Sequence, residues 1–199
     1  MNGDLRTTMK ESIEALGPEV ERASVAFVKR AVDSGAVDVS YCAIDSPFGP
    51  MLAATTHKGL VMLSYGTGED RLEELSSKIS PRILEAQLDD VRRQLDEYFE
   101  GRRQAFDLAL DLQLSRGFAL KVLRTTSRIP FGQVSTYRDV ARKAGNARAS
   151  RAAGNALGSN PMPIVVPCHR VVRTGGGLGG YTGGLGRKEW LLRLEGALS

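Results

Sequence analysis

The chain has 199 residues, 42% of them hydrophobic and 25% charged, a composition that is typical of globular proteins and argues against collagen-like and disordered classes. No run approaches the roughly 18 apolar residues of a membrane helix, and the N-terminus lacks the apolar core of a secretion signal, so we expect a cytoplasmic protein with no membrane partner. The chain has two cysteines and two histidines. We expect the cysteines to be reduced thiols, and we expect no bound metal and no cofactor.

The net charge of +4 divides into an acidic first region and a basic second region. Residues 1–113 contain 13 Lys and Arg against 20 Asp and Glu, a net of −7, whereas residues 114–199 contain 14 against 3, a net of +11. Such asymmetry favours a polyanionic partner for the second region, with nucleic acid as the first candidate. A basic face without a ligand is the alternative that charge alone leaves open.

The acidic region predicts helices followed by a sheet and a further helix. Apolar residues at helical spacing on both sides of Gly17-Pro18 predict two helices within residues 1–36. Three short apolar runs separated by turns then predict an antiparallel meander. These runs are residues 39–44, 51–56 and 60–66. Apolar residues at i, i+3 and i+4 spacing from Arg82 to Phe99 predict an amphipathic helix.

The basic region predicts a helix followed by a helix-turn-helix. Apolar residues between Phe118 and Leu123 indicate the first helix. A second helix over 137–145 and a third over 148–158 are separated by a short turn, and small residues line the third. A helix-turn-helix in a basic region favours DNA binding. We therefore expect an α+β protein with three regions. These are a helical extension (1–36), an α/β domain (37–113) and a DNA-binding domain (114–199).

The sequence Pro-Cys-His-Arg at 167–170, the reactive segment, carries the strongest chemical signal. Residues 164–166 are a β-branched run that predicts a short buried strand, which the proline ends just before Cys168. The thiolate is the nucleophilic form of cysteine, and the adjacent His and Arg are expected to lower the thiol pKa. Since consecutive strand residues point to opposite sides, a water is expected to relay a proton between Cys168 and His169. A buried structural cysteine is the alternative.

Two further segments flank this chemistry. Residues 175–180, the glycine-rich loop, formally match G-x-G-x-x-G, but no helix follows, which argues against a dinucleotide site. We interpret them as a loop whose amides, with the ring of Tyr181, wrap a planar ligand. The last predicted helix, 187–196, carries Glu195, which matters for the chemistry only if its carboxylate reaches His169.

These residues together resemble the O6-alkylguanine-DNA alkyltransferases, also called methylated-DNA–protein-cysteine methyltransferases. The resemblance rests on Pro-Cys-His-Arg-Val-Val at 167–172, Asn160-Pro, Tyr181-Thr-Gly-Gly-Leu and Lys188-Glu-Trp-Leu-Leu. It runs continuously from 129 to 195 and more weakly back to Val39, whereas the first 35 residues or so match nothing in the family core. It implies a ribonuclease-H-like N-terminal domain with an antiparallel sheet and a winged-helix-like C-terminal domain.

The resemblance implies direct repair of DNA, in which an alkylated guanine is flipped out of the duplex and its O6-alkyl group moves irreversibly to Cys168. His169, oriented by Glu195, would take the thiol proton through a water. Tyr137 would donate to guanine N3, so that the purine does not leave as a bare anion. The carbonyls of Cys168 and Val171 would accept from the guanine amino group. O4-alkylthymine stays open as a second substrate.

The resemblance also assigns DNA contacts and a substrate pocket. Arg151 would fill the gap left by the flipped base, and Asn160 would tie the recognition helix to the reactive segment. Small residues would let this helix enter the minor groove, which is only about 6 Å wide, and a monomer would bind double-stranded DNA largely independently of sequence. The other residues assigned to DNA are Arg148, Ala149, Ser150 and Gly154. Those assigned to the pocket are Pro163, Val171, Tyr181, Thr182 and Gly183.

One pocket position departs from the family pattern, and two alternative functions stay open. Thr182 stands where many relatives have serine, which keeps the hydroxyl and adds a methyl group. A lesion sensor that binds alkylated DNA without reacting is one alternative, and the presence of Cys168 argues against it. A cysteine hydrolase built from Cys168, His169 and Glu195 is the other, and it leaves the basic helix-turn-helix unexplained.

Overall fold

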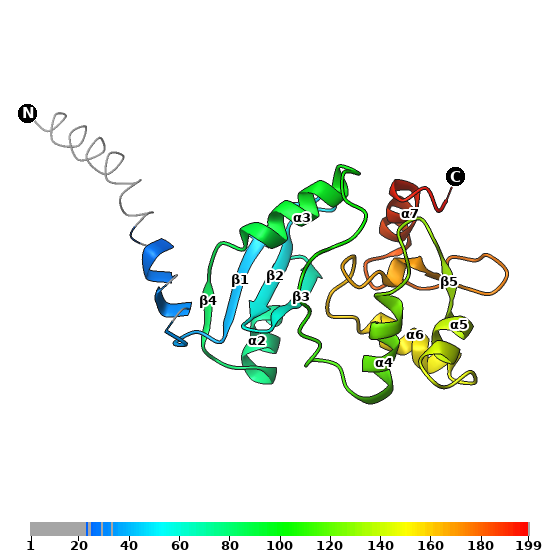
Figure 1. Cartoon of the computed structure of the whole chain (residues 1–199), viewed down its shortest axis with the longest axis horizontal. Coiled ribbons are helices and arrows are strands. Elements are labelled where there is room, and N and C mark those ends of the chain that lie inside the picture. Colours follow the sequence, from blue (N-terminus) through cyan, green and yellow to red (C-terminus); the bar gives the residue numbers. More distant parts are fainter. Residues whose placement is uncertain (1–22, 24, 29, 33, 199) are drawn as a thin grey trace, which may run out of the picture.

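A computed structural model describes residues 23, 25–28, 30–32 and 34–198 (Figure 1). The helices predicted within residues 1–36 lie mostly outside the described residues, and the residues described between 23 and 32 are helical. Nowhere in the described chain is a helix both long and apolar enough to cross a membrane. Figure 1 shows an N-terminal part (residues 34–113) built on a sheet, beside a mainly helical C-terminal part (residues 114–198).

The N-terminal part contains the predicted meander and one strand that the sequence did not predict. Strands β1 (Val39–Ile44), β2 (Met51–Thr56) and β3 (Gly59–Tyr65) pair antiparallel in sequence order, as expected. A fourth strand, β4 (Ile83–Glu85), pairs parallel to β1 and gives the order β3-β2-β1-β4. The sheet is therefore mixed rather than purely antiparallel.

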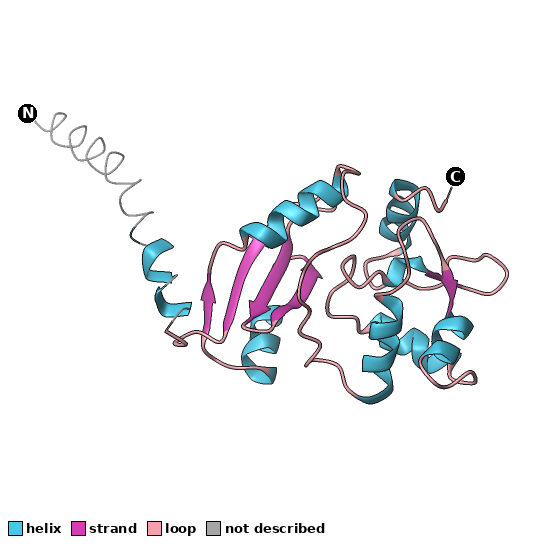
Figure 2. Ribbon diagram, viewed as in Figure 1, coloured by secondary structure: helices cyan, strands magenta, loops and turns pink. Residues whose placement is uncertain are grey.

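Two helices cover opposite faces of this sheet (Figure 2). Alternate residues of β2 point to opposite faces, so Met51 belongs to the apolar cluster that contains α3 (Asp89–Phe99). Its neighbour Leu52 belongs to the cluster that contains Leu75 of α2 (Glu69–Lys78). The sheet is thereby buried on both faces.

The helix predicted from Arg82 to Phe99 begins only at Asp89. Ile83 and Leu84, which fit the helical spacing, pair instead with the free edge of β1. An exposed strand edge carries unpaired backbone groups, and satisfying them outweighs the weak helical preference of a short segment. Two aspartates then occupy the first turn of α3, where negative charge is favourable.

The C-terminal part has four helices and a small sheet among its described residues. The helices are α4 (Gly117–Thr126), α5 (Tyr137–Lys143), α6 (Ser150–Gly158) and α7 (Leu185–Leu194). Strands β5 (Ser135–Thr136) and β6 (Val171–Val172) pair in parallel. The predicted helix-turn-helix is formed by α5 and α6, both of which pack on α4. Thr136 caps α5 by accepting a hydrogen bond from the amide of Asp139 at 3.1 Å.

Residues 164–166 are buried as predicted, but they form a turn rather than a strand. The amide of Val166 donates to the carbonyl of Met162 at 2.8 Å, and Ile164 has a φ of 75°, which a β-branched residue rarely adopts. The prolines in and beside the turn have no amide hydrogen and cannot supply a strand ladder. Cys168 therefore begins a short 3-10 helix, η1 (Cys168–Arg170), instead of ending a strand.

A single apolar cluster joins the two parts of the molecule. It includes Leu63 and Tyr98 from the N-terminal part and Ile164 and Leu191 from the C-terminal part. The amide of Leu63 also donates to the carbonyl of Pro161 at 2.8 Å. The turn that precedes the reactive segment is thus held against the edge of the sheet.

Candidate active site

A cavity of about 650 Å³ lies between the helix-turn-helix and the glycine-rich loop, and Cys168 lines it. Seven residues that the sequence predicted for the site line this cavity. They are Tyr137, Ser150, Arg151, Gly154, Cys168, Tyr181 and Thr182. Its volume is within the range of pockets that bind small molecules. The structure therefore brings the predicted nucleophile, the predicted DNA-binding helix and part of the predicted pocket to one opening.

The remaining predicted residues are not among those that line the cavity. Arg148 and Ala149 lie in the turn before α6, while Pro163 and Val171 are buried. Gly183 is needed for space, because a Cβ atom there would lie 2.5 Å from the ring of Tyr65 and 2.7 Å from that of Tyr181.

The thiol of Cys168 is buried and protonated at neutral pH. Its residue is 5% exposed, and Asn160 Nδ2 donates hydrogen bonds to Sγ at 3.2 Å and to the Val166 carbonyl at 2.8 Å. Burial raises the pKa of the Cys168 thiol to about 11, since removal of water disfavours the thiolate more than Asn160 and the nearby Lys188 favour it. The predicted lowering of this pKa by adjacent cationic groups is therefore wrong.

His169 has the protonation state and tautomer of a base. The residue is 0% exposed, and burial lowers its pKa below 6.5 despite the opposing effect of Glu195, so the ring is neutral at pH 7. Nε2 lies 2.9 Å from Glu195 Oε1. Because that carboxylate can only accept, Nε2 carries the hydrogen and Nδ1 carries the lone pair. Nδ1 is buried and accepts no hydrogen bond from the described residues.

Glu195 reaches His169 as the resemblance implied, and three other donors also bind its carboxylate. Tyr98 Oη donates to Oε1 at 2.7 Å, Arg170 donates to both oxygens at 2.8 Å, and the amide of Gly132 lies 3.3 Å from Oε2. Burial would raise the pKa of Glu195, but the hydrogen bonds from His169 and Arg170 outweigh it and lower the pKa to about 2. The carboxylate is ionised at neutral pH.

Lys188 is a functional candidate that the sequence reading missed. The side chain is 0% exposed, and Nζ donates to the carbonyl of Val171 at 2.5 Å and to that of Gly180 at 3.5 Å. Burial lowers the pKa of Lys188 to about 8. A carbonyl oxygen has two lone pairs, so the Val171 carbonyl keeps one for a ligand. A lysine on a helix next to apolar residues gave no sequence signal for this role.

Tyr137 and the glycine-rich loop fit one another closely. Tyr137 Oη donates to the Gly180 carbonyl at 3.2 Å. A Cβ atom at Gly179, whose φ is 73°, would come within 2.8 Å of the tyrosine ring and hydroxyl. The hydroxyl of Thr182, two residues after the loop, donates to the Gly158 carbonyl at 2.6 Å and joins this segment to the end of α6. These contacts set the shape of the cavity opposite Cys168.

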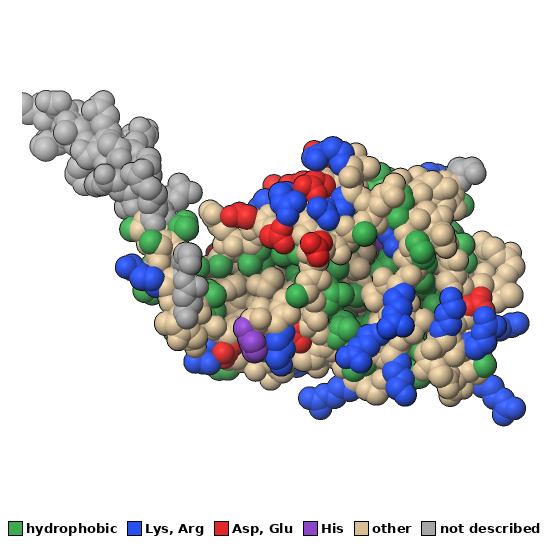
Figure 3. Space-filling view, in the orientation of Figure 1, with side chains coloured by type: hydrophobic (Ala, Val, Ile, Leu, Met, Phe, Trp, Pro, Cys, Tyr) green, Lys and Arg blue, Asp and Glu red, His purple; other side chains and the backbone are tan. Residues whose placement is uncertain are grey.

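Arg151 lies in the first turn of α6, exposed and beside the cavity. Ala153 of the same helix is 0% exposed, so the opposite side of α6 is packed into the protein. In Figure 3 blue Lys and Arg side chains predominate on the lower side of the C-terminal part, whereas red acidic side chains, interspersed with blue ones, gather near α3. The basic excess of residues 114–199 is thus exposed on this face of the C-terminal part.

Comparisons with known proteins agree with this arrangement. Residues 39–112 match the family described as 6-O-methylguanine DNA methyltransferase, ribonuclease-like domain, and residues 117–197 match its DNA binding domain. A methylated-DNA–protein-cysteine methyltransferase of Methanosarcina barkeri is 39% identical over 155 residues, which are 78% of this chain and 96% of the relative. One from Mycolicibacterium paratuberculosis is 38% identical, over 79% of this chain and 92% of the relative.

Solved structures from Mycobacterium tuberculosis share the fold. The O6-methylguanine methyltransferase has a TM-score of 0.68 and 35% identity, covering 81% of this chain and 94% of that one. A structure described as OGT in complex with DNA has a TM-score of 0.68 and 34% identity, covering 78% and 92%. The chain therefore belongs to the O6-alkylguanine-DNA alkyltransferase family, the methylated-DNA–protein-cysteine methyltransferases.

Proposed function

We propose that the protein repairs DNA by transferring an alkyl group from O6 of guanine to Cys168, once per molecule. The observation that carries this proposal is the position of the Cys168 thiol, which lines a cavity beside the DNA-binding helix and is followed in η1 by a neutral histidine paired with a carboxylate. Its relatives are named methylated-DNA–protein-cysteine methyltransferases. A thioether formed at Cys168 has no route back to the thiol here, so each molecule reacts once.

The reaction starts from a thiol rather than a stored thiolate. His169 Nδ1 accepts the proton of Cys168 through a water, and the resulting imidazolium is stabilised by the ionised Glu195. The sulfur then forms a bond to the alkyl carbon as the bond from that carbon to O6 breaks. The electron pair of the broken bond passes to the guanine, which leaves as the unalkylated base.

Groups in and beside the cavity support the leaving guanine. Once its hydroxyl leaves the Gly180 carbonyl, Tyr137 donates its proton or a hydrogen bond to guanine N3, which prevents a bare anion from forming. The Val171 carbonyl, held by Lys188, accepts from the guanine amino group with its second lone pair. Tyr181 and Thr182 line the cavity, where we expect them to contact the flipped base.

For DNA we propose minor-groove binding through α6, by a monomer and largely without sequence preference. The small side chains at Ala149, Ser150 and Gly154 allow close approach to a narrow groove. Arg151 is exposed and lines the cavity, and we expect its guanidinium to occupy the gap that a flipped base leaves. The basic surface of the C-terminal part supplies phosphate contacts, which carry affinity but no sequence information.

The proposal also includes the domain bounds, the location of the protein and its substrates. We keep residues 37–113 as the α/β domain, residues 114–199 as the DNA-binding and alkyl-accepting domain, and residues 1–36 as a separate extension. A cytoplasmic location suits a thiol nucleophile, since both Cys42 and Cys168 are free. O6-alkylguanine in DNA is the primary substrate, with O4-alkylthymine as a second candidate.

Intact mass measurement tests the transfer directly. Incubation with duplex DNA that contains O6-methylguanine is expected to add one methyl group, about 14 Da, to the peptide that carries Cys168. Cys168→Ser should abolish the increase, whereas Cys42→Ser, which replaces the other cysteine at the same 5% exposure, should retain it. Tight DNA binding with no mass change in the wild type would instead support the lesion sensor, and repeated turnover would support a hydrolase.

A further inference from the structure

The buried tyrosine of α3 connects the sheet to the proton-accepting pair. Tyr98 is 0% exposed, and its hydroxyl donates to Glu195 Oε1 at 2.7 Å. The same oxygen lies 2.9 Å from His169 Nε2. Tyr98 does not line the cavity that contains Cys168, so the tyrosine can act on the reaction only through the carboxylate that it shares with the histidine.

Packing around the ring of Tyr98 fixes the position of its hydroxyl. Its ring packs against those of Phe99, Phe106 and Phe131, with centroid separations of 5.6, 5.2 and 6.2 Å. Phe131 belongs to the C-terminal part, so the tyrosine is held from both sides of the junction. A hydroxyl on a ring so confined has little freedom to leave the carboxylate.

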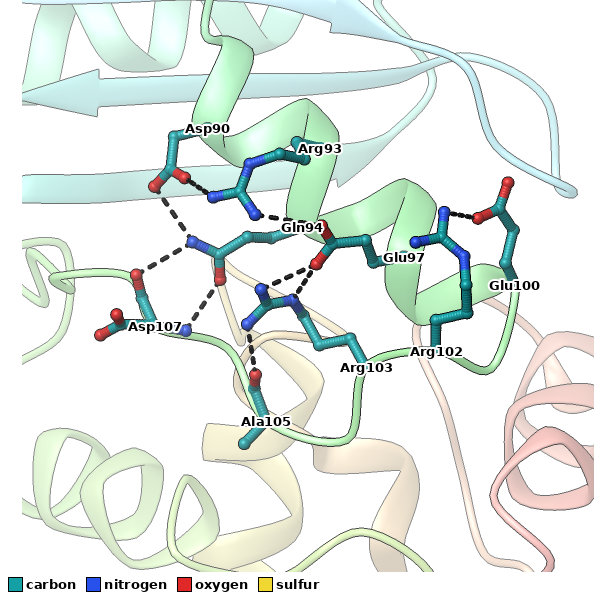
Figure 4. A network of polar contacts seen from close by, with 9 residues as sticks. All are labelled: Asp90, Arg93, Gln94, Glu97, Glu100, Arg102, Arg103, Ala105 and Asp107. Atoms are coloured by element: carbon teal, nitrogen blue, oxygen red, sulfur yellow. Dashed lines mark hydrogen bonds and ion pairs between the residues drawn. The ribbon is translucent and has the colours of Figure 1, made fainter.

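Polar contacts between α3 and the segment that follows it hold the helix in place (Figure 4). Gln94 donates to the carbonyl of Asp107 at 3.0 Å and accepts from its amide at 2.8 Å. Arg103 donates to Glu97 at 2.7 Å and thereby binds the segment after the helix back onto it. The helix and the following segment therefore form one unit that carries Tyr98 to Glu195.

We propose that Tyr98 is a positioning residue for alkyl transfer: its hydroxyl fixes Glu195, and the carboxylate in turn holds His169 with the hydrogen on Nε2 and Nδ1 free as proton acceptor. This role rests on the proposed function. It also gives the N-terminal part a role, exerted through Glu195, in a reaction whose nucleophile, proton acceptor and carboxylate, Cys168, His169 and Glu195, all come from the C-terminal part.

The charges around His169 determine what loss of the hydroxyl would do. The other titratable groups that act on the pair are Arg170 of η1, Lys188 of α7 and Tyr98 of α3. Arg170 and Tyr98 donate to the same carboxylate as His169, and each donor withdraws part of its negative charge. Without the Tyr98 hydroxyl, Glu195 would stabilise the imidazolium more strongly, so the pKa of His169 would rise.

Tyr98→Phe tests this proposal, because it removes the hydroxyl and keeps the ring that packs in the core. The chain has only two histidines, so a protein with ¹⁵N-labelled histidine gives one titration curve for His169 and one for exposed His57. We expect the His169 curve to move to higher pH by roughly half a unit or more and the His57 curve to stay in place. The plateau rate of transfer from free O6-benzylguanine should fall about tenfold, the equivalent of one net hydrogen bond.

The pH profile separates positioning from simple stabilisation. The acid limb of the Tyr98→Phe rate profile should shift by the same amount as the His169 titration. Tyr41→Phe, which removes a hydroxyl beside the other apolar cluster of the sheet, should shift neither. If Tyr98→Phe lowers the melting temperature but leaves the His169 titration and the rate profile unchanged, the hydroxyl has only a structural role and the proposal is wrong.

A measurement on the wild type covers the case in which Tyr98→Phe does not fold. The hydroxyl proton of Tyr98 and the Nε2 proton of His169 point at one oxygen, so an NMR cross-relaxation peak between them is expected at neutral pH, and its absence would overturn the proposal. Failure of the proposed function gives a different result. Wild-type Cys168 would then gain no alkyl mass, whereas Tyr98→Phe would still shift the titration of His169.

Discussion

Replacing His169 with glutamine tests whether the imidazole removes the proton from Cys168 during transfer. The glutamine amide can still donate to Glu195, but it cannot act as a base at neutral pH. The substitution therefore removes the proton acceptor while it retains a donor for the buried carboxylate. His57→Gln, in the exposed turn between β2 and β3, is the matched control.

The expected magnitude follows from the two pKa values. With the Cys168 pKa at about 11, only about one molecule in ten thousand carries a thiolate at pH 7. If that fraction alone reacted, the rate would rise tenfold per pH unit. With neutral His169 as base, the rate should instead be nearly flat between its lowered pKa and that of the thiol. General-base catalysis typically contributes about 10² to 10⁴, so we expect a loss of that size in His169→Gln at pH 7.

Single-turnover transfer from free O6-benzylguanine, followed by intact mass from about pH 6 to about pH 10, measures both profiles without the pH dependence of DNA binding. The wild type and His57→Gln should show the plateau, and His169→Gln should show the steep dependence and approach the wild type at high pH. A wild-type rate that rises tenfold per unit between about pH 7 and 9 and coincides with that of His169→Gln would refute the mechanism, because it would show reaction through pre-formed thiolate.

Two further changes test the DNA contact and the buried carboxylate. Arg151→Ala should slow transfer from alkylated duplex at least about tenfold while transfer from free O6-benzylguanine stays unchanged, and equal loss in both would remove its base-replacing role. Glu195 has a lowered pKa of about 2, so its stabilising effect is present above the unfolded pKa and is lost as the pH falls toward 2. Between pH 7 and about pH 2, the free energy of unfolding measured in urea should fall by roughly 3 kcal/mol less in Glu195→Gln than in the wild type.

Local patterns predicted the elements whose partners are near in sequence. The runs at 39–44 and 51–56 are β1 and β2 to the residue, because alternation and the intervening turn both act over a few residues. The helix-turn-helix was predictable for the same reason. By contrast, β4 and the late start of α3 depend on the edge of β1, about forty residues away, and no local spacing reports that edge.

The reactive segment shows a similar limit at the level of chemistry. The sequence identified Cys168 and His169 by their neighbours, and the resemblance added Glu195, which the structure places 2.9 Å from the imidazole. The state of the thiol was predicted wrongly because adjacent cations are visible in a sequence, whereas burial is not. Here desolvation is the larger effect, and it reverses the sign of the expected pKa shift.

The sequence did not indicate the roles of Tyr98 and Lys188, and both residues carry polar atoms into the core. A tyrosine at a core-facing helical position looks apolar, and a lysine on a helix looks solvated. Yet a buried charge needs partners, and Glu195 is buried at a junction where the C-terminal part supplies only some of its donors. Because α3 supplies the Tyr98 hydroxyl, the acidic N-terminal part influences the reaction of the basic part through the buried carboxylate.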